Sequence, residues 1–331
     1  MSAISFGWGG ETMLTLRNGV GALWVAIAWR AFLLGAADNE LEALKAAANQ
    51  CSTALEVANE GVVQEGKPYN VTRFKLDTKM VRYLLRYQSF LGANASENPR
   101  LLNDGASGYG MLQPHGYWYG NGFLDAALRT SQGLLSASQC EGGVKVLEES
   151  GQRAAFDLRF GQPGAGMVLR TAALAGRGEL FVELRGKAEA RFTLSATFHG
   201  YPLGFNAPFD RCVHTAAGET GNSGTNYVTT ALDPSKSQWL LLTDHKLNAD
   251  GKRSGQLGLV FRRAGVKSLR VTHGGNYVIN VDFVGGEDVG ALDFIVCDFD
   301  VMTIKGAEDK LAVLAKDSDG LFKRAFDGLP E

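Results

Sequence analysis

The stretch Arg191-Phe-Thr-Leu-Ser-Ala-Thr-Phe198 decides the fold class. Its apolar side chains, at positions 192, 194, 196 and 198, alternate with polar ones. Because neighbouring side chains of a strand point to opposite faces, this alternation buries one face and leaves the other polar. The segment therefore predicts a half-buried strand of an antiparallel sheet.

The same alternation recurs on both sides of this stretch. Glycine-rich turns separate the segments, and no helix stands between them to connect parallel strands. The 42 glycines among 331 residues suit such a body. Residues 142–304 are therefore predicted to form an antiparallel β-sandwich or jelly-roll-like body. Its further strands are predicted at 153–160, 180–184, 239–242, 257–261, 277–283 and 292–296.

Helical spacing is seen towards both ends of the chain. Apolar residues recur at intervals of three and four over 23–59, 77–91 and 308–326, and a short helix is predicted over 124–135. The predicted fold class is therefore α+β, with an N-terminal helical region packed on the sandwich. The predicted parts are a mainly helical N-terminal region (1–102), a Gly- and aromatic-rich connecting segment (103–141), the β-sandwich (142–304) and a C-terminal helix (305–331).

Composition and charge exclude several classes of protein. Apolar residues make up 45% and charged residues 21% of the chain, which excludes a disordered tail, a collagen and a coiled coil. The net charge of −2 excludes a chain held to nucleic acid by bulk charge. The sequence has no glycine-rich phosphate loop, nucleophile elbow, HExxH helix or acidic calcium loop. We therefore assign no cofactor.

The cysteines and the apolar segments indicate the compartment. Cys51, Cys140, Cys212 and Cys297 form no CxxC pair, so we expect four thiols rather than a disulfide framework or a zinc knuckle. The most apolar stretch, 20–37, is interrupted by Arg30 and is shorter than a bilayer requires. We therefore expect a cytoplasmic protein without a membrane partner.

The connecting segment contains the first candidate site. Residues 115–120 read His-Gly-Tyr-Trp-Tyr-Gly, and flat rings with polar edges suit the faces of sugars. His115 is the candidate acid or base, paired with Asp104, Asp125 or Asp210. The alternative is that these aromatics seal the joint between the two halves of the protein. The predicted stacking residues are Tyr109, Tyr117, Trp118 and Tyr119.

A second segment repeats this spacing. His199-Gly-Tyr201-Pro-Leu-Gly204 echoes residues 115–120, so His199 and Tyr201 would join the ligand-binding set if the two segments meet. Shared turn chemistry is the simpler explanation of the match.

Histidines of the second half lie near the ends of predicted strands. His214 stands close to Cys212, and His245 and His273 follow predicted strands. Sandwiches and jelly rolls do hold metals with such residues. No HxH or HxxxH spacing is present, however, and the sequence selects no metal ligands.

The predicted helix over 77–91 supports a rival function. Lys79, Arg82 and Arg86 would share one face beside Tyr83 and Tyr87, and interleaved cations and rings suit single-stranded RNA. The alternative is a helix with a solvated basic flank.

These observations predict binding, and acid–base processing, of a polar ligand, a carbohydrate in the first place. The order of a helical part and a β-sandwich resembles the layout of polysaccharide lyases, and the stretch from Asn103 to Gly120 loosely resembles their aromatic substrate loops. The helical part is too short for their toroid and no lyase motif matches, so no residue's role is taken from that family. The rival from another class is a self-assembling shell-like subunit, or an RNA-binding subunit of a ribonucleoprotein. The expected partners are a polar small molecule or glycan and a further copy of the chain.

Overall fold

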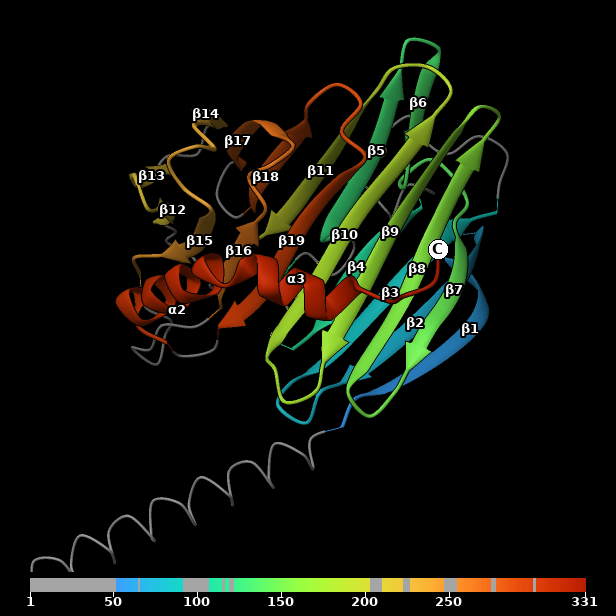
Figure 1. Cartoon of the computed structure of the whole chain (residues 1–331), viewed down its shortest axis with the longest axis horizontal. Helices are drawn as coiled ribbons and strands as arrows, with labels where there is room; N and C mark the ends of the chain where they lie inside the picture. The colour runs from blue at the N-terminus through green and yellow to red at the C-terminus, as the bar shows by residue number, and fades with distance from the viewer. Residues whose placement is uncertain are drawn as a thin grey trace, which may run out of the picture. The chain divides into compact units, whose positions relative to one another are not determined.

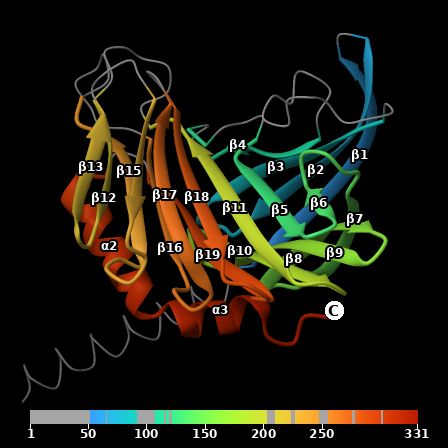
Figure 2. The ribbon, with the colours of Figure 1, turned by 90° about the horizontal axis from the view of Figure 1, so that it is seen from above.

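The structure is a computed structural model. It describes residues 52–64, 66–91, 107–114, 117–118, 122–202, 210–222, 227–246, 255–274, 278–299 and 302–331. These residues form two β-sheets and two helices, and all of the strand pairs are antiparallel. Figures 1 and 2 show the arrangement from two directions.

Sheet A consists of ten strands. Its spatial order is β1 (Ala54–Gln64), β2 (Lys67–Asp77), β3 (Arg82–Phe90), β4 (Gly108–Gln113), β5 (Leu124–Thr130), β11 (Phe192–Gly200), β18 (Val278–Gly285), β17 (Val266–Gly274) and β14 (Val228–Leu232), with β6 (Gly133–Ser136) beside β5.

Sheet B consists of nine strands. Its spatial order is β13 (Gly218–Asn222), β12 (Arg211–Thr215), β15 (Trp239–Asp244), β16 (Gln256–Phe261), β19 (Ala291–Phe299), β10 (Glu179–Ala188), β9 (Ala165–Leu174), β8 (Arg153–Gln162) and β7 (Gly143–Glu149).

The hydrophobic core lies between the two sheets. In β11, Leu194, Ala196 and Phe198 are fully buried, as the alternation of residues 191–198 predicts. Phe198 of sheet A meets Phe294 of sheet B edge to face, with ring centroids 5.0 Å apart. The predicted strands and their antiparallel pairing are thus confirmed.

The two helices cover the other face of sheet B (Figures 1 and 2). Helix α2 (Ile304–Lys316) begins at Thr303, whose hydroxyl accepts a hydrogen bond from the backbone N–H of Gly306. Helix α3 (Ser318–Phe326) follows directly. Their apolar sides form a second core with sheet B, so the predicted terminal helix is present as two helices. Neither described helix is long and apolar enough to cross a membrane.

The predicted N-terminal helical region is not supported in the described residues. The segment 77–91 is a turn followed by β3, in which Tyr83, Leu85 and Tyr87 are buried on one face. Lys79 stands in the turn with a positive φ of 67°. The helix prediction failed because Val81, Leu84 and Leu85 also fit helical spacing, while the alternation from 82 to 88 is the pattern that the sheet uses.

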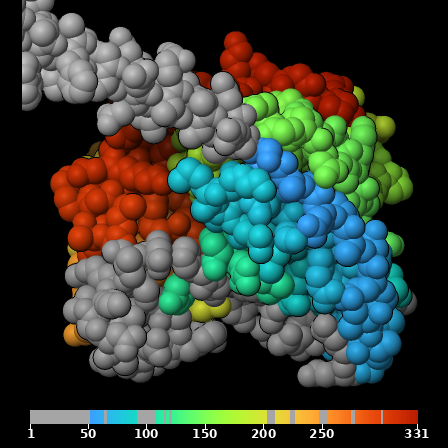
Figure 3. Space-filling view, turned by 90° about the horizontal axis from the view of Figure 1, so that it is seen from below, coloured from blue at the N-terminus to red at the C-terminus, as the bar shows by residue number. Residues whose placement is uncertain are grey.

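Two further helix predictions also fall on strands. The end of the predicted 23–59 helix is β1, which is the edge strand of sheet A. Its residues are the blue atoms at the right of Figure 3, and residues 23–51 lie outside the described part. The segment 124–135 forms β5 and β6. Strands of the sandwich therefore begin at Ala54, well before the predicted boundary at 142.

The described cysteines are free thiols. Cys140, Cys212 and Cys297 form no disulfide, which agrees with the prediction from their spacing, and Cys51 lies outside the described residues. Cys212 and Cys297 are buried.

Candidate ligand-binding face of sheet A

One half of sheet A carries polar side chains on the face opposite to the core. Positions 124, 126 and 128 of β5 and 279, 281 and 283 of β18 are buried in the core, so the residues between them point the other way. Figure 2 shows β5, β11, β18 and β17 side by side. We call this surface the polar face; its residues are Asp125, Thr197, His199, Arg270, Thr272, Asn280 and Asp282.

The first row of the polar face is built around carboxylates. The strand register places Asp125, Thr197 and Asp282 side by side. The Thr197 hydroxyl donates to Asp282 Oδ1 at 2.8 Å, and Arg270 Nη2 lies 3.8 Å from Asp282 Oδ2. Asp125 Oδ2 accepts a hydrogen bond of 3.4 Å from Ser138 Oγ. The row thus combines two acids with the groups that hold them in place.

The second row contains the histidine. His199 pairs with Asn280, which in turn pairs with Thr272. His199 Nδ1 lies 2.8 Å from Asn280 Oδ1, and because an amide oxygen only accepts, this bond places a proton on Nδ1. The neutral ring then has its lone pair on Nε2, the atom that can accept a proton.

Two polar residues of β3 adjoin this surface. Arg86 and Gln88 pair with Gly110 and Gly108 of β4, and the pairing of Tyr109 with Leu124 brings Gly108 beside Asp125. Since Gly108 has no side chain, no side chain of β4 stands between Gln88 and Asp125.

Gln88 and Asn280 are buried although this face is turned away from the core, whereas Arg270 is exposed and the other residues of the polar face are half-buried. Gln88 is 1% exposed and Asn280 is 9% exposed. Burial lowers the pKa of the Arg86 guanidinium, and the nearby charge of Arg73 adds to this. Buried polar groups away from the apolar core are more informative about function than exposed ones.

The two segments with the repeated spacing lie side by side. Trp118 and Gly200 form an antiparallel bridge, and the Tyr201 N–H donates to the Tyr117 carbonyl at 2.8 Å. Tyr117 and Tyr201 are half-buried. At Gly255, which has a φ of +70°, a Cβ atom would lie 2.4 Å from the Tyr117 ring, so glycine allows this close approach.

Two predicted stacking rings are core residues. Trp118 and Tyr109 have no exposed surface. Trp118 contacts Phe123 and Phe198 edge to face, and the Tyr109 hydroxyl shares a hydrogen bond of 3.0 Å with Thr171. Burial raises the pKa of Tyr109. Neither ring offers a face to a ligand here. The alternative, a seal between a helical half and the β half, does not describe them either, because they pack inside the core between the two sheets.

The predicted catalytic residues do not all come together. His115 and Tyr119, like Asp104, lie outside the described residues. Asp125 is on the polar face, whereas Asp210 is at the start of β12 in sheet B, where its N–H lies 3.2 Å from Asp244 Oδ1. Asp125 and Asp210 therefore belong to different sheets.

The basic residues of the rival function lose their common helix face. Lys79 is in the turn before β3, and Arg82 pairs with Asp77, with Nη2 3.1 Å from Oδ2. Arg86 is the one of the three that borders the polar face. The helix on which the RNA-binding prediction rested is not formed.

Sequence reasoning missed Gln88, Asn280 and Asp282. The signal was present, because Asn280 and Asp282 are the polar members of the alternating segment 277–283. Only the register shows that these positions adjoin His199 and Thr197.

Comparisons with known proteins give a set of distant structural likenesses. No family model and no curated protein matches the sequence. The chain is similar to a putative aldose 1-epimerase from Klebsiella pneumoniae, with 9% identity over 79% of this chain and 92% of that chain and a TM-score of 0.40. It is also similar to the α-N-acetylgalactosaminidase NagBb from Bifidobacterium bifidum, with 13% identity over 78% of this chain and 39% of that one and a TM-score of 0.44.

A third similar structure is the GH36 α-galactosidase AgaA from Geobacillus stearothermophilus in complex with stachyose. Its identity is 10%, over 53% of this chain and 30% of that chain, and its TM-score is 0.35. The chain thus spans less than half of the galactosidases that it matches. With such identities and TM-scores below 0.5, these likenesses assign no activity to this chain.

Proposed function

We propose that the polar face of sheet A binds a polar ligand, a carbohydrate in the first place, and moves a proton on it. One observation carries this proposal. An imidazole, two carboxylates and an amide stand in adjacent rows, on the side of the sheet that the hydrophobic core does not need. The set includes the buried amide of Asn280, and the buried amide of Gln88 adjoins it.

The residue types suit the recognition of hydroxyl groups. Each hydroxyl of a sugar both donates and accepts a hydrogen bond. Arg86, Arg270 and the amide of Gln88 are donors, while Asp125 and Asp282 are acceptors. A ligand with several hydroxyls would find donors and acceptors alternating across the strands.

The spacing also suits acid–base chemistry. Thr197 stands between Asp125 and Asp282, and His199 is the next residue on the same face, so the imidazole is a diagonal neighbour of both acids. Diagonal neighbours on one face of an antiparallel pair are about 7–8 Å apart at Cα. Side chains at that separation reach two atoms of one sugar ring from opposite sides.

The simplest reaction for an imidazole beside a carboxylate is proton exchange at the hemiacetal of a reducing sugar. A carboxylate, Asp125 or Asp282, removes the proton of the anomeric hydroxyl while His199, once protonated at Nε2, donates that proton to the ring oxygen, and the ring C–O bond breaks to give the open-chain carbonyl. The reverse steps close the ring from either face of the carbonyl. This exchange needs no cofactor or co-reactant.

Titration calorimetry with common monosaccharides, and polarimetry of freshly dissolved sugar, test the proposal. We expect binding of at least one sugar and faster interconversion of its anomers. His199→Gln is expected to slow the interconversion about a hundredfold, because glutamine can still hydrogen-bond Asn280 but takes up no proton.

Arg129→Gln is the matched control, since Arg129 is an exposed residue of β5. It is expected to keep both properties. Wild-type protein that neither binds a sugar nor accelerates the interconversion would refute the proposal.

A further inference from the structure

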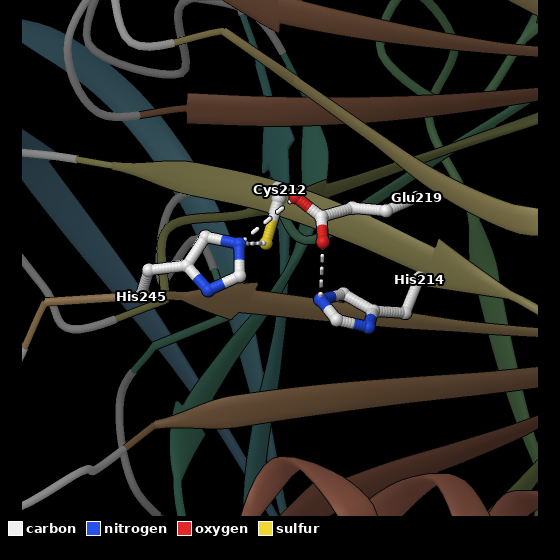
Figure 4. Close-up of side chains that lie close together, drawn as sticks. All are labelled: Cys212, His214, Glu219 and His245. Carbon is white, nitrogen blue, oxygen red and sulfur yellow. Dashed lines mark hydrogen bonds and ion pairs between the residues drawn. The ribbon is translucent and has the colours of Figure 1, made fainter.

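Four potential metal ligands converge at one end of sheet B (Figure 4). They come from three neighbouring strands: Cys212 and His214 from β12, Glu219 from β13, and His245 from the residue after β15. The register explains the convergence, because His214 pairs with Glu219 and Cys212 pairs with Thr243, two residues before His245. We call these four residues the cluster.

The ligand atoms are already close to one another. One atom from each residue lies within 4.8 Å of the other three. Cys212 Sγ is 3.2 Å from His245 Nε2, which is 2.8 Å from Glu219 Oε1. His214 Nε2 is 3.4 Å from Glu219 Oε2. Bonds of 2.0–2.3 Å to a tetrahedral ion place its ligand atoms about 3.3–3.6 Å apart, so small shifts suffice to seat one.

A residue outside the cluster orients one of the imidazoles. Glu308 of helix α2 lies with Oε1 2.9 Å from His214 Nδ1. A carboxylate on Nδ1 fixes the proton there and directs the Nε2 lone pair towards the cluster, which is how metal-ligating histidines are held. His214 Nε2 is buried and has no hydrogen-bond partner among the described residues.

Hydrogen bonds leave one nitrogen of the cluster without a partner. His245 Nε2 lies beside both the sulfur and the carboxylate, and the Cys212 thiol also hydrogen-bonds Glu219, but His214 Nε2 has no hydrogen bond among the described residues. His214 Nε2 approaches the same carboxylate at a distance beyond a good hydrogen bond. A cation at the centre would give all four atoms a partner at once.

We infer that the cluster binds one Zn²⁺ ion through Cys212, His214, Glu219 and His245. A thiolate, two imidazoles and one carboxylate form a borderline-soft donor set, which zinc accepts and which magnesium and calcium do not favour. Cys212 is buried, whereas the side chain of Glu219 is 44% exposed. The ion would therefore enter from the Glu219 side and join β12, β13 and β15 to helix α2 through Glu308.

Competition with a chromophoric chelator, using the full chain stripped of metal, tests the inference. We expect one Zn²⁺ per chain and a higher melting temperature when zinc is present, because the assembled cluster binds the ion more tightly than the unfolded chain does. Cys212→Ser and His245→Ala are each expected to weaken zinc binding at least about tenfold, and Glu308→Gln about tenfold. Cys140→Ser is the matched control, since Cys140 is a described free thiol outside the cluster. This variant is expected to bind zinc as tightly as the wild type.

Cobalt gives a readout that does not depend on the stability of a variant. Co²⁺ bound by the wild type should show a thiolate-to-metal charge-transfer band, and Cys212→Ser should lose it while Glu308→Gln keeps it. Wild-type protein that binds no zinc, or a charge-transfer band that persists in Cys212→Ser, would overturn the inference. Sugar binding at the polar face is measured separately, so the two proposals fail independently.

Discussion

The outward faces of the two sheets both carry charged residues, but the side chains that surround these residues differ. On sheet B, a row across β8, β9, β10 and β19 contains Asp157, Arg170, Glu183 and Asp293. These residues are buried, and each has an ion-pair partner of opposite charge. The polar face of sheet A combines a histidine and an amide with two carboxylates, and its ion pair between Arg270 and Asp282 is more exposed.

We expect the buried ion pairs of sheet B to serve the stability of the fold, and the less buried polar face of sheet A to serve the proposed chemistry. Arg170 donates from Nε and Nη2 to both oxygens of Asp157, at 2.8 and 3.2 Å, and its Nη2 also donates to the Pro330 carbonyl at 2.6 Å. Such a bidentate pair is committed to the protein itself. The sheet B row should therefore govern stability, and the polar face should govern ligand binding.

The largest effect is expected from Asp157→Ala. The substitution leaves the Arg170 guanidinium buried without its carboxylate, which costs about 3–5 kcal/mol of unfolding free energy. Denaturant unfolding measures this loss. The double variant Asp157→Leu with Arg170→Met should recover much of it, because it removes the stranded charge. A loss below about 1 kcal/mol for Asp157→Ala would contradict the structural role of the row.

Asp293 should give a smaller effect that depends on pH. Burial raises the pKa of this carboxyl to about 6, so the folded protein retains a proton at a pH where the unfolded chain has released it. The unfolding free energy therefore falls as the pH rises from about 4 to about 6, by roughly 2–3 kcal/mol.

The control for this prediction is the Asp293→Asn variant, whose amide side chain does not titrate. The difference in stability between wild type and variant should change across that pH range and stay constant above it. A difference that is constant from pH 4 to pH 7 would mean that the Asp293 carboxyl is not perturbed.

Asn280→Ala tests the polar face and should lower the unfolding free energy by only about 1 kcal/mol, through the loss of one hydrogen bond. Asn280 holds the His199 ring through Nδ1, so its loss should reduce sugar turnover about tenfold, which corresponds to about 1.4 kcal/mol. We expect this loss in kcat and a change in the pH profile of the reaction, with KM little changed, since Asn280 is a positioning residue. Asn280→Asp should restore part of the rate. A raised KM together with a clearly lowered melting temperature would instead indicate a structural role.

The smallest effect is expected at the Arg191–Glu287 pair. Its side chains are 78% and 57% exposed, so solvent and salt screen their attraction. Arg191→Ala should leave the denaturation midpoint, sugar binding and zinc binding unchanged. A clear change in any of these three quantities would show that this exposed ion pair contributes to stability or binding.

The strand content of the second half was predictable because it depends on neighbouring residues. The alternation around Leu194 and Phe198 needs no knowledge of the rest of the chain. The first half was harder, because the segment 82–88 fits both periods and only its pairing with β2 and β4 decides between them. Self-assembly of the chain stays a prediction, which light scattering tests.

The candidate sites were less accessible to sequence reasoning than the fold. His199 and Asp125 were selected, but as partners of an aromatic loop rather than as members of a sheet face. The cluster of Cys212, His214, Glu219 and His245 escaped selection, since its spacing matches no short motif and His245 lies 33 residues from Cys212.

The sequence by itself determined that the chain forms antiparallel strands, that their apolar side chains alternate, and that helix closes its C-terminal part. These properties are local, because backbone preference and alternation act over a few residues. The tertiary structure alone decided that Trp118 is interior, that His199 meets Asn280 across 81 residues, and that four metal-ligand types converge on sheet B. Strand register makes those choices, and register is set by long-range pairing and by which faces the core covers.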